Sequence, residues 1–217
     1  MKKLITISRE YGSGGRLVGQ LVAKELSYEF YDKEIIDMAA KESGLSADFI
    51  AKTEQKISSS WLYNLLVGST YAGGVSTGKT GQAIGGQTNT LPLADQVFNA
   101  QRKTILSIAK KGPCVIVGRC ADYILSSSDE VNRKDLLNVF IYGKMEEKIK
   151  RIETIYKDTE SAAKKKIIQI DKHRANHYNT FTDNVWGDRT NYDLMINTST
   201  LGIEEAAKLI AKVAENV

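Results

Sequence analysis

Residues 4–26 read LITISREYGSGGRLVGQLVAKEL, and this stretch decides the fold. Residues 4–8 form an apolar run typical of a β-strand, and residues 17–26 repeat apolar residues at helical spacing. Between them lies a turn rich in glycine. A strand, a glycine turn and a helix in that order build a phosphate-binding site, because glycines let backbone N–H groups converge and the helix N-terminus carries a partial positive charge. The stretch therefore predicts that residues 12–16 bind a phosphate group.

A second stretch, residues 73–80 (GGVSTGKT), matches the pattern Gly-x-x-x-x-Gly-Lys-[Ser/Thr] in every letter. That pattern binds phosphate only when a strand leads into it and a helix follows it. Residues 81–86 (GQAIGG) are too rich in glycine to hold a helix. We therefore interpret residues 73–80 as a polar loop that matches by chance, and expect Lys79→Ala to change nucleotide binding little. The N-terminal stretch has the right context, but it lacks the lysine, and Leu17 replaces the hydroxyl residue expected after it.

Length, composition and charge predict one soluble domain. The 217 residues, 42% of them hydrophobic, suffice for one substantial core, so we expect a single domain over residues 1–217. The 30 Lys and Arg are interspersed with 26 Asp and Glu, for a net charge of +4, which suits the binding of small anions better than the coating of nucleic acid. Two cysteines cannot build a disulfide framework, and no segment resembles a signal-peptide core or a membrane span. We expect a cytoplasmic protein with no membrane or nucleic-acid partner.

Apolar patterning predicts an α/β fold of three layers. Five strands are expected, at residues 4–8, 29–31, 114–117, 137–142 and 193–196. The third and fourth are too continuously apolar to have a solvated face, which indicates a parallel sheet covered by helices on both sides. Helices are expected at residues 14–26, 33–43, 94–111, 145–156, 160–178 and 203–215. Residues 58–90 are rich in Ser, Gly, Thr and Gln. A segment of this length and composition is typical of a lid, a binding loop or disorder.

Charged residues follow the third expected strand. Residues 115–122 read VIVGRCAD and place Arg119 and Asp122 at the carboxyl edge of the sheet, where ligands of open α/β sheets bind. This segment resembles the strand end of bacterial cytidylate kinases. The resemblance extends to residues 30–34 (FYDKE), 138–142 (NVFIY), 145–151 (MEEKIKR), 171–174 (DKHR) and 194–205 (LMINTSTLGIEE). Because residues 8–16 read SREYGSGGR, the chain is most similar to the cytidylate kinase-like group.

The resemblance implies a P-loop fold of the nucleoside-monophosphate-kinase type, with a five-stranded parallel sheet and a helical lid. It also implies an ATP-dependent phosphotransferase that acts on CMP, dCMP or a related small acceptor. Residues 32–100 would form the mobile acceptor-binding insertion and residues 157–190 the lid. Mg²⁺ is expected with the nucleotide, and its protein ligand stays open. The implied site residues are Gly12, Ser13, Gly14, Gly15 and Arg16 for the ATP phosphates, Asp32, Arg119 and Asp122 for the acceptor, and Arg16, Lys172 and Arg174 for catalysis.

Departures from the family pattern keep a second function open. Arg16 would replace the missing lysine one position late, and a planar guanidinium does not equal a compact ammonium. Met38 stands near the position of a family arginine, and Asn197 replaces a family aspartate. A protein of the same fold that binds a nucleotide without transferring phosphate is therefore the first alternative. A nucleic-acid-binding module is a further one, and the interleaved acidic residues argue against it.

Each candidate residue also has a purely structural interpretation. Arg119 and Asp122 can form an ion pair at the strand end, and Asp32 can cap the helix that follows it. Lys172 and Arg174 can lie on a solvated helix face. His173 and His177, four residues apart on the same helix, can share a Zn²⁺ ion, but the sequence offers no third ligand. Cys120 can carry a lowered pKa beside Arg119, although an inert packed thiol is the simpler interpretation.

Overall fold

The computed structural model describes residues 1–44, 46–48, 50 and 93–217. Its five strands form one parallel sheet in the order β2-β3-β1-β4-β5. They are β1 (Leu4–Arg9), β2 (Glu29–Tyr31), β3 (Cys114–Val117), β4 (Leu136–Tyr142) and β5 (Leu194–Asn197). Every expected strand is present with ends that differ by at most one residue. The predicted α/β class and the five-stranded parallel sheet are confirmed.

The helices agree with the apolar periodicity where they are long. The structure contains α1 (Gly15–Leu26), α2 (Glu34–Ser43), α5 (Leu93–Lys111), α6 (Ala121–Ser126), α7 (Met145–Tyr156), α8 (Glu160–Phe181), α9 (Thr198–Leu201) and α10 (Ile203–Asn216). Two single 3₁₀ turns lie at Arg133–Asp135 and Arg189–Asn191. The sequence analysis missed α6 and α9, because helices of six and four residues are too short to show a repeat.

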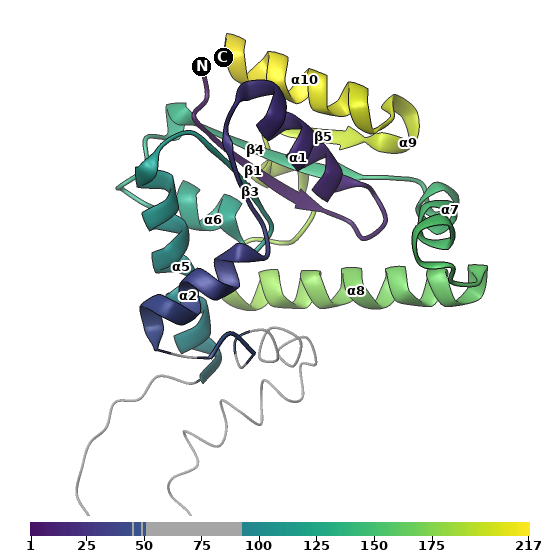
Figure 1. The fold of residues 1–217 in the computed structure, drawn as a ribbon, viewed down its shortest axis with the longest axis horizontal. Helices are drawn as coiled ribbons and strands as arrows, with labels where there is room; N and C mark the ends of the chain where they lie inside the picture. Colours follow the sequence, from purple (N-terminus) through teal and green to yellow (C-terminus); the bar gives the residue numbers. More distant parts are fainter. Residues whose placement is uncertain (45, 49, 51–92) are drawn as a thin grey trace, which may run out of the picture.

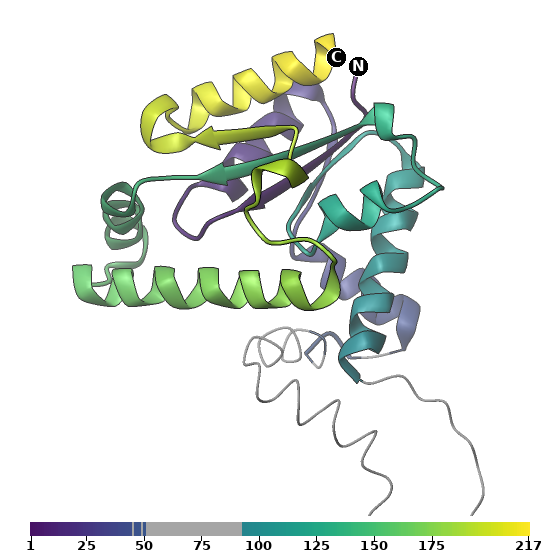
Figure 2. The same ribbon diagram turned by 180° about the vertical axis from the view of Figure 1, so that it is seen from behind.

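Helices cover both faces of the sheet, as the apolar strands require. Ile5 and Ile7 of β1 point to one face and pack in a core cluster with residues of α1 and α10, which lie side by side there (Figure 1). Leu4 points to the opposite face, where it packs in a second cluster with residues of α5 and α6. Figure 2 shows these two helices from behind. The alternation along β1 follows from the period of two in a β-strand. The sheet is therefore dry on both faces, and its carboxyl edge is left for a ligand.

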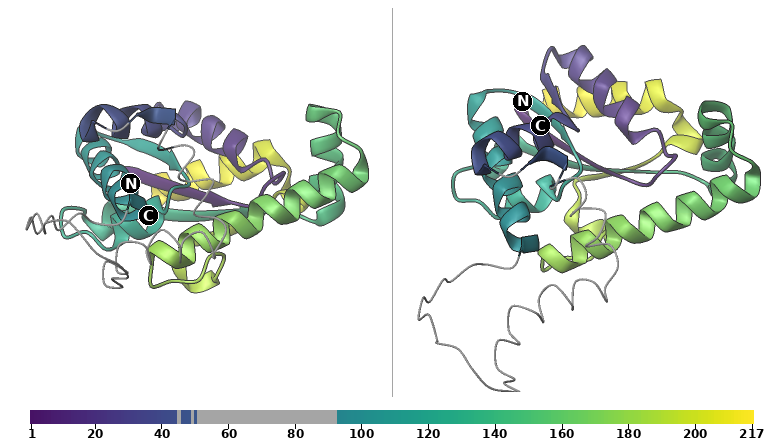
Figure 3. Two further views of the ribbon diagram at one scale, coloured as in Figure 1. Left: turned by 90° about the horizontal axis from the view of Figure 1, so that it is seen from below. Right: turned by 60° about the horizontal axis from the view of Figure 1, so that its bottom comes forward.

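The long helix α8 runs along this edge. Its 22 residues span about 33 Å, and it extends from α7 at one end to α5 at the other (Figure 3). At the second end Phe181 stacks on Phe98 of α5, with ring centroids 4.6 Å apart. The residues expected to form the lid thus begin with a helix that faces the ends of β1 and β3. Among the described residues, no helix combines the length and the apolar character needed to cross a bilayer.

Candidate active site

The glycine turn joins β1 to α1, and two of its positions have backbone angles that favour glycine. Gly12 and Gly14 have φ angles of 78° and 80°, in the left-handed region that favours glycine. A side chain on Gly14 would also meet Ile203, because a Cβ there would lie 2.7 Å from its Cδ1 atom. Ser13 is fully buried, and its hydroxyl donates to the carbonyl oxygen of Glu10 at 2.8 Å. The turn is therefore fixed from within, since the N–H of Gly15 also donates to the Ser13 hydroxyl at 3.3 Å. The next two N–H groups of α1 have no intrahelical acceptor.

The segment after β5 supports the same turn. The Thr198 hydroxyl donates to the carbonyl oxygen of Ser13 at 2.7 Å, across 185 residues of sequence. Asn197 caps α9, because its side-chain oxygen accepts from the N–H of Ser199 at 2.9 Å. Asparagine caps helices as well as aspartate does, so the Asn197 departure preserves this contact.

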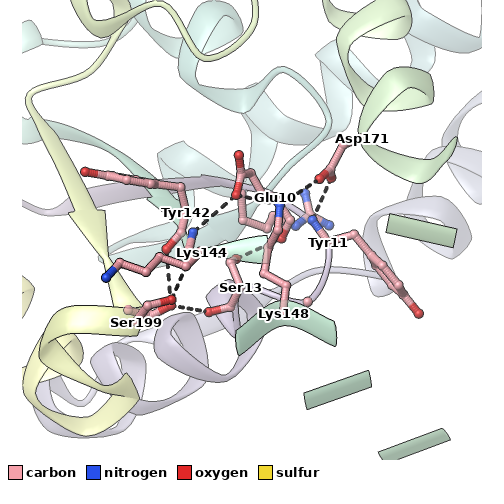
Figure 4. A network of polar contacts seen from close by, with 12 residues as sticks. Glu10, Tyr11, Ser13, Tyr142, Lys144, Lys148, Asp171 and Ser199 are labelled. Atoms are coloured by element: carbon pink, nitrogen blue, oxygen red, sulfur yellow. Dashed lines mark hydrogen bonds and ion pairs between the residues drawn. The ribbon is translucent and has the colours of Figure 1, made fainter. Parts of the chain in front are cut away.

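A network of charged groups covers the outer side of the turn, and we call Glu10, Tyr11, Lys148 and Asp171 the loop network (Figure 4). Lys148 of α7 is only 5% exposed, and its Nζ lies 2.9 Å from Glu10 Oε2 and 3.5 Å from Asp171 Oδ2. The N–H of Tyr11 donates to Asp171 Oδ1 at 2.6 Å. Burial raises the pKa of Asp171, although the hydrogen bond from Tyr11 opposes the shift. A carboxylate of α8 thus occupies the backbone N–H of Tyr11, next to Gly12 in the glycine turn.

Three arginines surround Asp32, which directly follows β2. Arg16 Nε lies 2.7 Å from Asp32 Oδ2, while guanidinium nitrogens of Arg9 and Arg119 lie 3.8 and 3.7 Å from Oδ1. Arg119 also donates to the backbone oxygen of Asp32 at 2.8 Å. The Asp32 side chain is 5% exposed and that of Arg16 is 51% exposed. Asp32 therefore organises cations and does not cap α2, whose N-cap is Lys33.

The chain after β3 has an unusual backbone. Gly118, Arg119 and Cys120 have φ angles of 76°, 55° and 54°, so three consecutive residues are left-handed. For Arg119 and Cys120 this conformation costs about 1 kcal/mol each, since their Cβ atoms crowd the backbone. Such strain clusters at functional sites, where surrounding contacts hold it. Here it turns the Arg119 side chain toward Asp32.

A cavity of about 350 Å³ lies between this strand end and α8, and we call it the arginine cavity. Its charged lining consists of Arg9, Arg119 and Arg174, with His173 and His177 beside them. No Asp or Glu is among the described residues that line it. The remaining lining residues are Ser8, Gly118, Cys120, Ile170, Tyr178 and Trp186. A cavity with cationic walls and two aromatic side chains suits a small anion that carries a ring.

Two side chains of α8 connect the cavity to the rest of the site. Arg174 donates from Nη1 to the backbone oxygen of Arg9 at 2.9 Å and lies 3.5 Å from Asp171 Oδ1. The Nδ1 atom of His177 lies 3.5 Å from the Cys120 sulfur. Arg174 therefore contacts both the end of β1 and the loop network.

Asp122 lies behind the cavity and not in it, which differs from the expected contact with the acceptor. It is 2% exposed and accepts a hydrogen bond from the hydroxyl of Tyr178 at 2.8 Å. Burial raises the pKa of Asp122 to about 6, although that hydrogen bond opposes the shift. The helix α6 begins at Ala121 and turns Asp122 inward, which short-range sequence patterns do not reveal. Its contact with Tyr178 makes it a support for the cavity wall.

Lys172 is also placed differently from the expectation. It is exposed on α8 and is not among the lining residues, whereas its neighbours His173 and Arg174 line the cavity. Lys172 points in a different direction from its neighbours because successive residues of an α-helix are rotated by about 100° around the helix axis. The structure thus brings together Arg16, Asp32, Arg119, Arg174 and the turn at residues 12–15, and leaves Lys172 outside.

Two residues of the site, Arg9 and Lys148, were not predicted from the sequence. Arg9 lies beside the glycine turn and Lys148 lies in the helix α7. Lys148 lies 138 residues from its partner Glu10, so only the fold brings them together. The motif at residues 73–80 lies outside the described residues, as does the whole segment 58–90.

The donor groups near the turn do not fit a Mg²⁺ ion held by the protein. Arg16 and Leu17 follow Gly15, and the Ser13 hydroxyl is buried in a hydrogen bond to the backbone. Among the residues that the structure describes, no three His, Cys, Asp or Glu side chains gather as metal ligands, and this includes the pair His173 and His177. We assign no step to a metal ion bound by these side chains.

Comparisons with known proteins agree with this geometry. A model of the cytidylate kinase-like family matches residues 4–200. No curated protein matches the chain. Among solved structures, an uncharacterized protein from Eubacterium ventriosum is similar over 100% of both chains, with 24% identity and a TM-score of 0.69. Shikimate kinase from Bacteroides thetaiotaomicron is similar over 98% of both chains, with 12% identity and a TM-score of 0.50. TT1252 from Thermus thermophilus aligns with all of this chain and 98% of its own, with 12% identity and a TM-score of 0.51.

Proposed function

The chain belongs to the cytidylate kinase-like family, and on this premise we propose that it transfers the terminal phosphoryl group of ATP to a nucleoside monophosphate. CMP and dCMP are the first candidates for the acceptor. The family and the kinase-type fold support phosphoryl transfer, while the choice of acceptor depends on the cavity and on the resemblance of residues 115–122 to cytidylate kinases.

The observation that carries the proposal is the cationic lining of the arginine cavity. Arg9, Arg119 and Arg174 approach it from β1, the end of β3 and α8. A phosphate monoester offers three oxygens, and guanidinium groups bind such oxygens with paired N–H donors. The volume of about 350 Å³ falls at the small end of the range for ligand sites. A monophosphate with its base beside Trp186 and Tyr178 fits this chemistry.

The donor nucleotide would bind at the glycine turn. The N–H groups of residues 12–16 and the N-terminus of α1 would hold the triphosphate, and Arg16 would contact it from the exposed side. The N–H of Tyr11 is occupied by Asp171, so a phosphate at that position must displace this carboxylate. Arg174, which contacts both Asp171 and the end of β1, lies between the two ligand positions.

Acceptor-dependent release of ADP tests the proposal. Purified protein is incubated with ATP, MgCl₂ and each of the common nucleoside monophosphates, and ADP is measured with a coupled assay. We expect release above the background hydrolysis with a cytidine monophosphate and little with the purine nucleotides. Equal background rates with every acceptor would contradict the proposed reaction.

A specific observation favours the second candidate, a nucleotide-binding protein that transfers nothing. The turn carries Gly15 in place of the lysine, and Asp171 already occupies the N–H of Tyr11. For this candidate, calorimetry with ATP would show binding while the acceptor panel gives no ADP. The two candidates therefore differ in one assay on the same protein.

A further inference from the structure

Because Gly15 has no side chain, the space beside it is occupied by the side chain of Arg9. In the written phosphate-loop pattern the lysine directly follows the second glycine, and with Gly14 as that glycine the lysine position is occupied by Gly15. A Cβ atom on Gly15 would lie 2.5 Å from Cβ and 3.1 Å from Cγ of Arg9. Real Cβ atoms do not approach so closely, so a lysine at this position and the observed Arg9 side chain exclude each other.

A second glycine accommodates the other end of the same side chain. A Cβ atom on Gly118 would overlap Nη1 of Arg9 and lie 2.8 Å from its Cζ. Beyond Gly118 the guanidinium reaches Asp32, with Nη2 at 3.8 Å from Oδ1. Arg9 therefore extends from the glycine turn, across the end of β3, to the arginine cavity that it lines.

We propose that Arg9, admitted by Gly15 and positioned by Gly118, is a catalytic residue that supplies the cation which the turn lacks. This inference rests on the proposed phosphoryl transfer. The Cβ and Cγ atoms of Arg9 adjoin the turn at Gly15, and its guanidinium lies over Gly118 in the lining of the cavity, so the transferring phosphoryl group would pass beside it. Charge that develops on the phosphoryl oxygens is stabilised by a cation that is already in place.

Three other cations near the turn are less suited to this role. Arg151 donates to the carbonyl oxygen of Gly12 and does not line the cavity. Arg16 is 51% exposed, so solvent and salt screen its charge, whereas Arg9 is 19% exposed. Lys148 is buried, but it contacts two carboxylates in the loop network and does not line the cavity. Among these four residues, Arg9 alone lines the cavity.

The proposed step balances without a proton transfer. A phosphate oxygen of the dianionic acceptor forms a bond to the γ-phosphorus of ATP. The bond from that phosphorus to the oxygen bridging the β- and γ-phosphates breaks, and ADP leaves with the electron pair. Arg9 keeps its proton and donates N–H groups to the oxygens of the transferring group.

Substitutions of Arg9 test the role, with Arg16→Gln as the matched comparison and Arg102→Gln on the exposed side of α5 as the neutral control. We expect Arg9→Gln to lower kcat roughly 100-fold or more, because one transition-state donor is worth this much. Arg9→Lys should recover part of the loss, since it restores the charge without the planar fork. Arg16→Gln should lose less than about tenfold. An Arg9→Gln variant that melts like the wild type and keeps kcat within threefold would overturn the proposal.

Binding measurements separate this proposal from the proposed function. If the wild type releases no ADP with any acceptor, the proposed reaction fails, and calorimetry with ATP then tests Arg9 alone. We expect roughly tenfold weaker ATP binding by Arg9→Gln than by wild type, from the loss of a charged hydrogen bond. Unchanged ATP affinity in that case would overturn the role of Arg9.

A double-mutant cycle tests the part played by Gly118. Gly118→Ala strains the backbone in any background, but it displaces a guanidinium only when Arg9 is present. We therefore expect a much larger fold-loss of ATP affinity from Gly118→Ala in the wild type than in the Arg9→Gln background. Equal losses in both backgrounds would overturn the claim that Gly118 positions Arg9.

Discussion

The loop network and the arginine cavity are adjacent, but carboxylates lie within the loop network and outside the lining of the cavity. In the loop network the carboxylates of Glu10 and Asp171 contact Lys148, and Asp171 also occupies the N–H of Tyr11. The cavity is lined by three arginines and by no described carboxylate. Asp32 and Asp171, the carboxylate partners of the cavity arginines, do not line the cavity, whereas in the loop network a carboxylate occupies the N–H of Tyr11 beside the glycine turn. We therefore expect ATP to displace the Asp171 carboxylate when it binds, and the acceptor to enter the cavity without displacing a carboxylate.

The largest effect is expected from the cavity. Arg119→Gln removes a side chain that is 11% exposed and turned toward Asp32 by a left-handed backbone. Because a hydrogen bond to a charged group is worth about 1.5–3 kcal/mol, the KM for the acceptor should rise roughly 10- to 100-fold. The KM for ATP should change less than threefold. Steady-state kinetics with each substrate varied in turn checks this, and equal increases in both KM values would remove the distinction between the two regions.

A smaller effect concerns the wall of the cavity. Burial raises the pKa of Asp122 to about 6, so the folded protein holds this proton to a higher pH than the unfolded chain does. Stability is therefore lost as the pH rises from about 4, the unfolded pKa, through about 6, and the full cost persists at neutral pH.

Asp122→Asn keeps a neutral acceptor for Tyr178 and removes this cost. The unfolding free energy of the variant, minus that of the wild type, should rise by about 2 kcal/mol between pH 4.5 and 7.5. Urea denaturation at several pH values measures the difference. If the difference in unfolding free energy between variant and wild type did not change with pH, the Asp122 carboxyl group would not be buried away from solvent.

A still smaller effect tests the loop network. Asp171→Ala frees the N–H of Tyr11 and removes a carboxylate that contacts Lys148 and Arg174. ATP should bind roughly three- to tenfold more tightly, since the gain of one hydrogen bond is worth about 1 kcal/mol. Calorimetry checks the affinity, with Asp171→Asn as the variant that retains an acceptor for Tyr11. Weaker ATP binding by Asp171→Ala would mean that this carboxylate supports the bound nucleotide and does not compete with it.

The smallest effect is expected at Lys172. Its side chain is exposed and lies outside the cavity, so Lys172→Gln should change kcat and both KM values less than twofold. Arg174→Gln, two residues away and in the cavity lining, is the comparison and should lose at least tenfold in kcat/KM. A loss at Lys172 as large as the loss at Arg174 would restore the role that the sequence resemblance gave it.

The elements of the fold were predictable because apolar periodicity is a local property. The strand Cys114–Val117 is an unbroken apolar run, and α10 repeats apolar residues down one face, so both are visible without any long-range contact. The glycine turn between β1 and α1 was predictable for the same reason, since its strand, glycines and helix are consecutive.

The charged part of the site was only partly predictable. Arg119 and Asp32 follow strands whose carboxyl ends meet at one edge, so the parallel sheet itself places them together. Arg9 was missed because its importance depends on the empty volume at Gly15 and Gly118, which lie on two different elements. The inward turn of Asp122 depends on a left-handed backbone at residues 118–120, and local sequence patterns carry little signal for such a conformation.

The positions of the two phosphate-bearing ligands test the account most directly. A crystal structure with CMP and a non-hydrolysable ATP analogue would locate both. We expect the triphosphate beside the N–H groups of residues 12–16, the γ-phosphate within hydrogen-bond distance of Arg9, and the acceptor phosphate between Arg119 and Arg174. A triphosphate bound elsewhere, or an arginine cavity without the acceptor at saturating concentration, would contradict it.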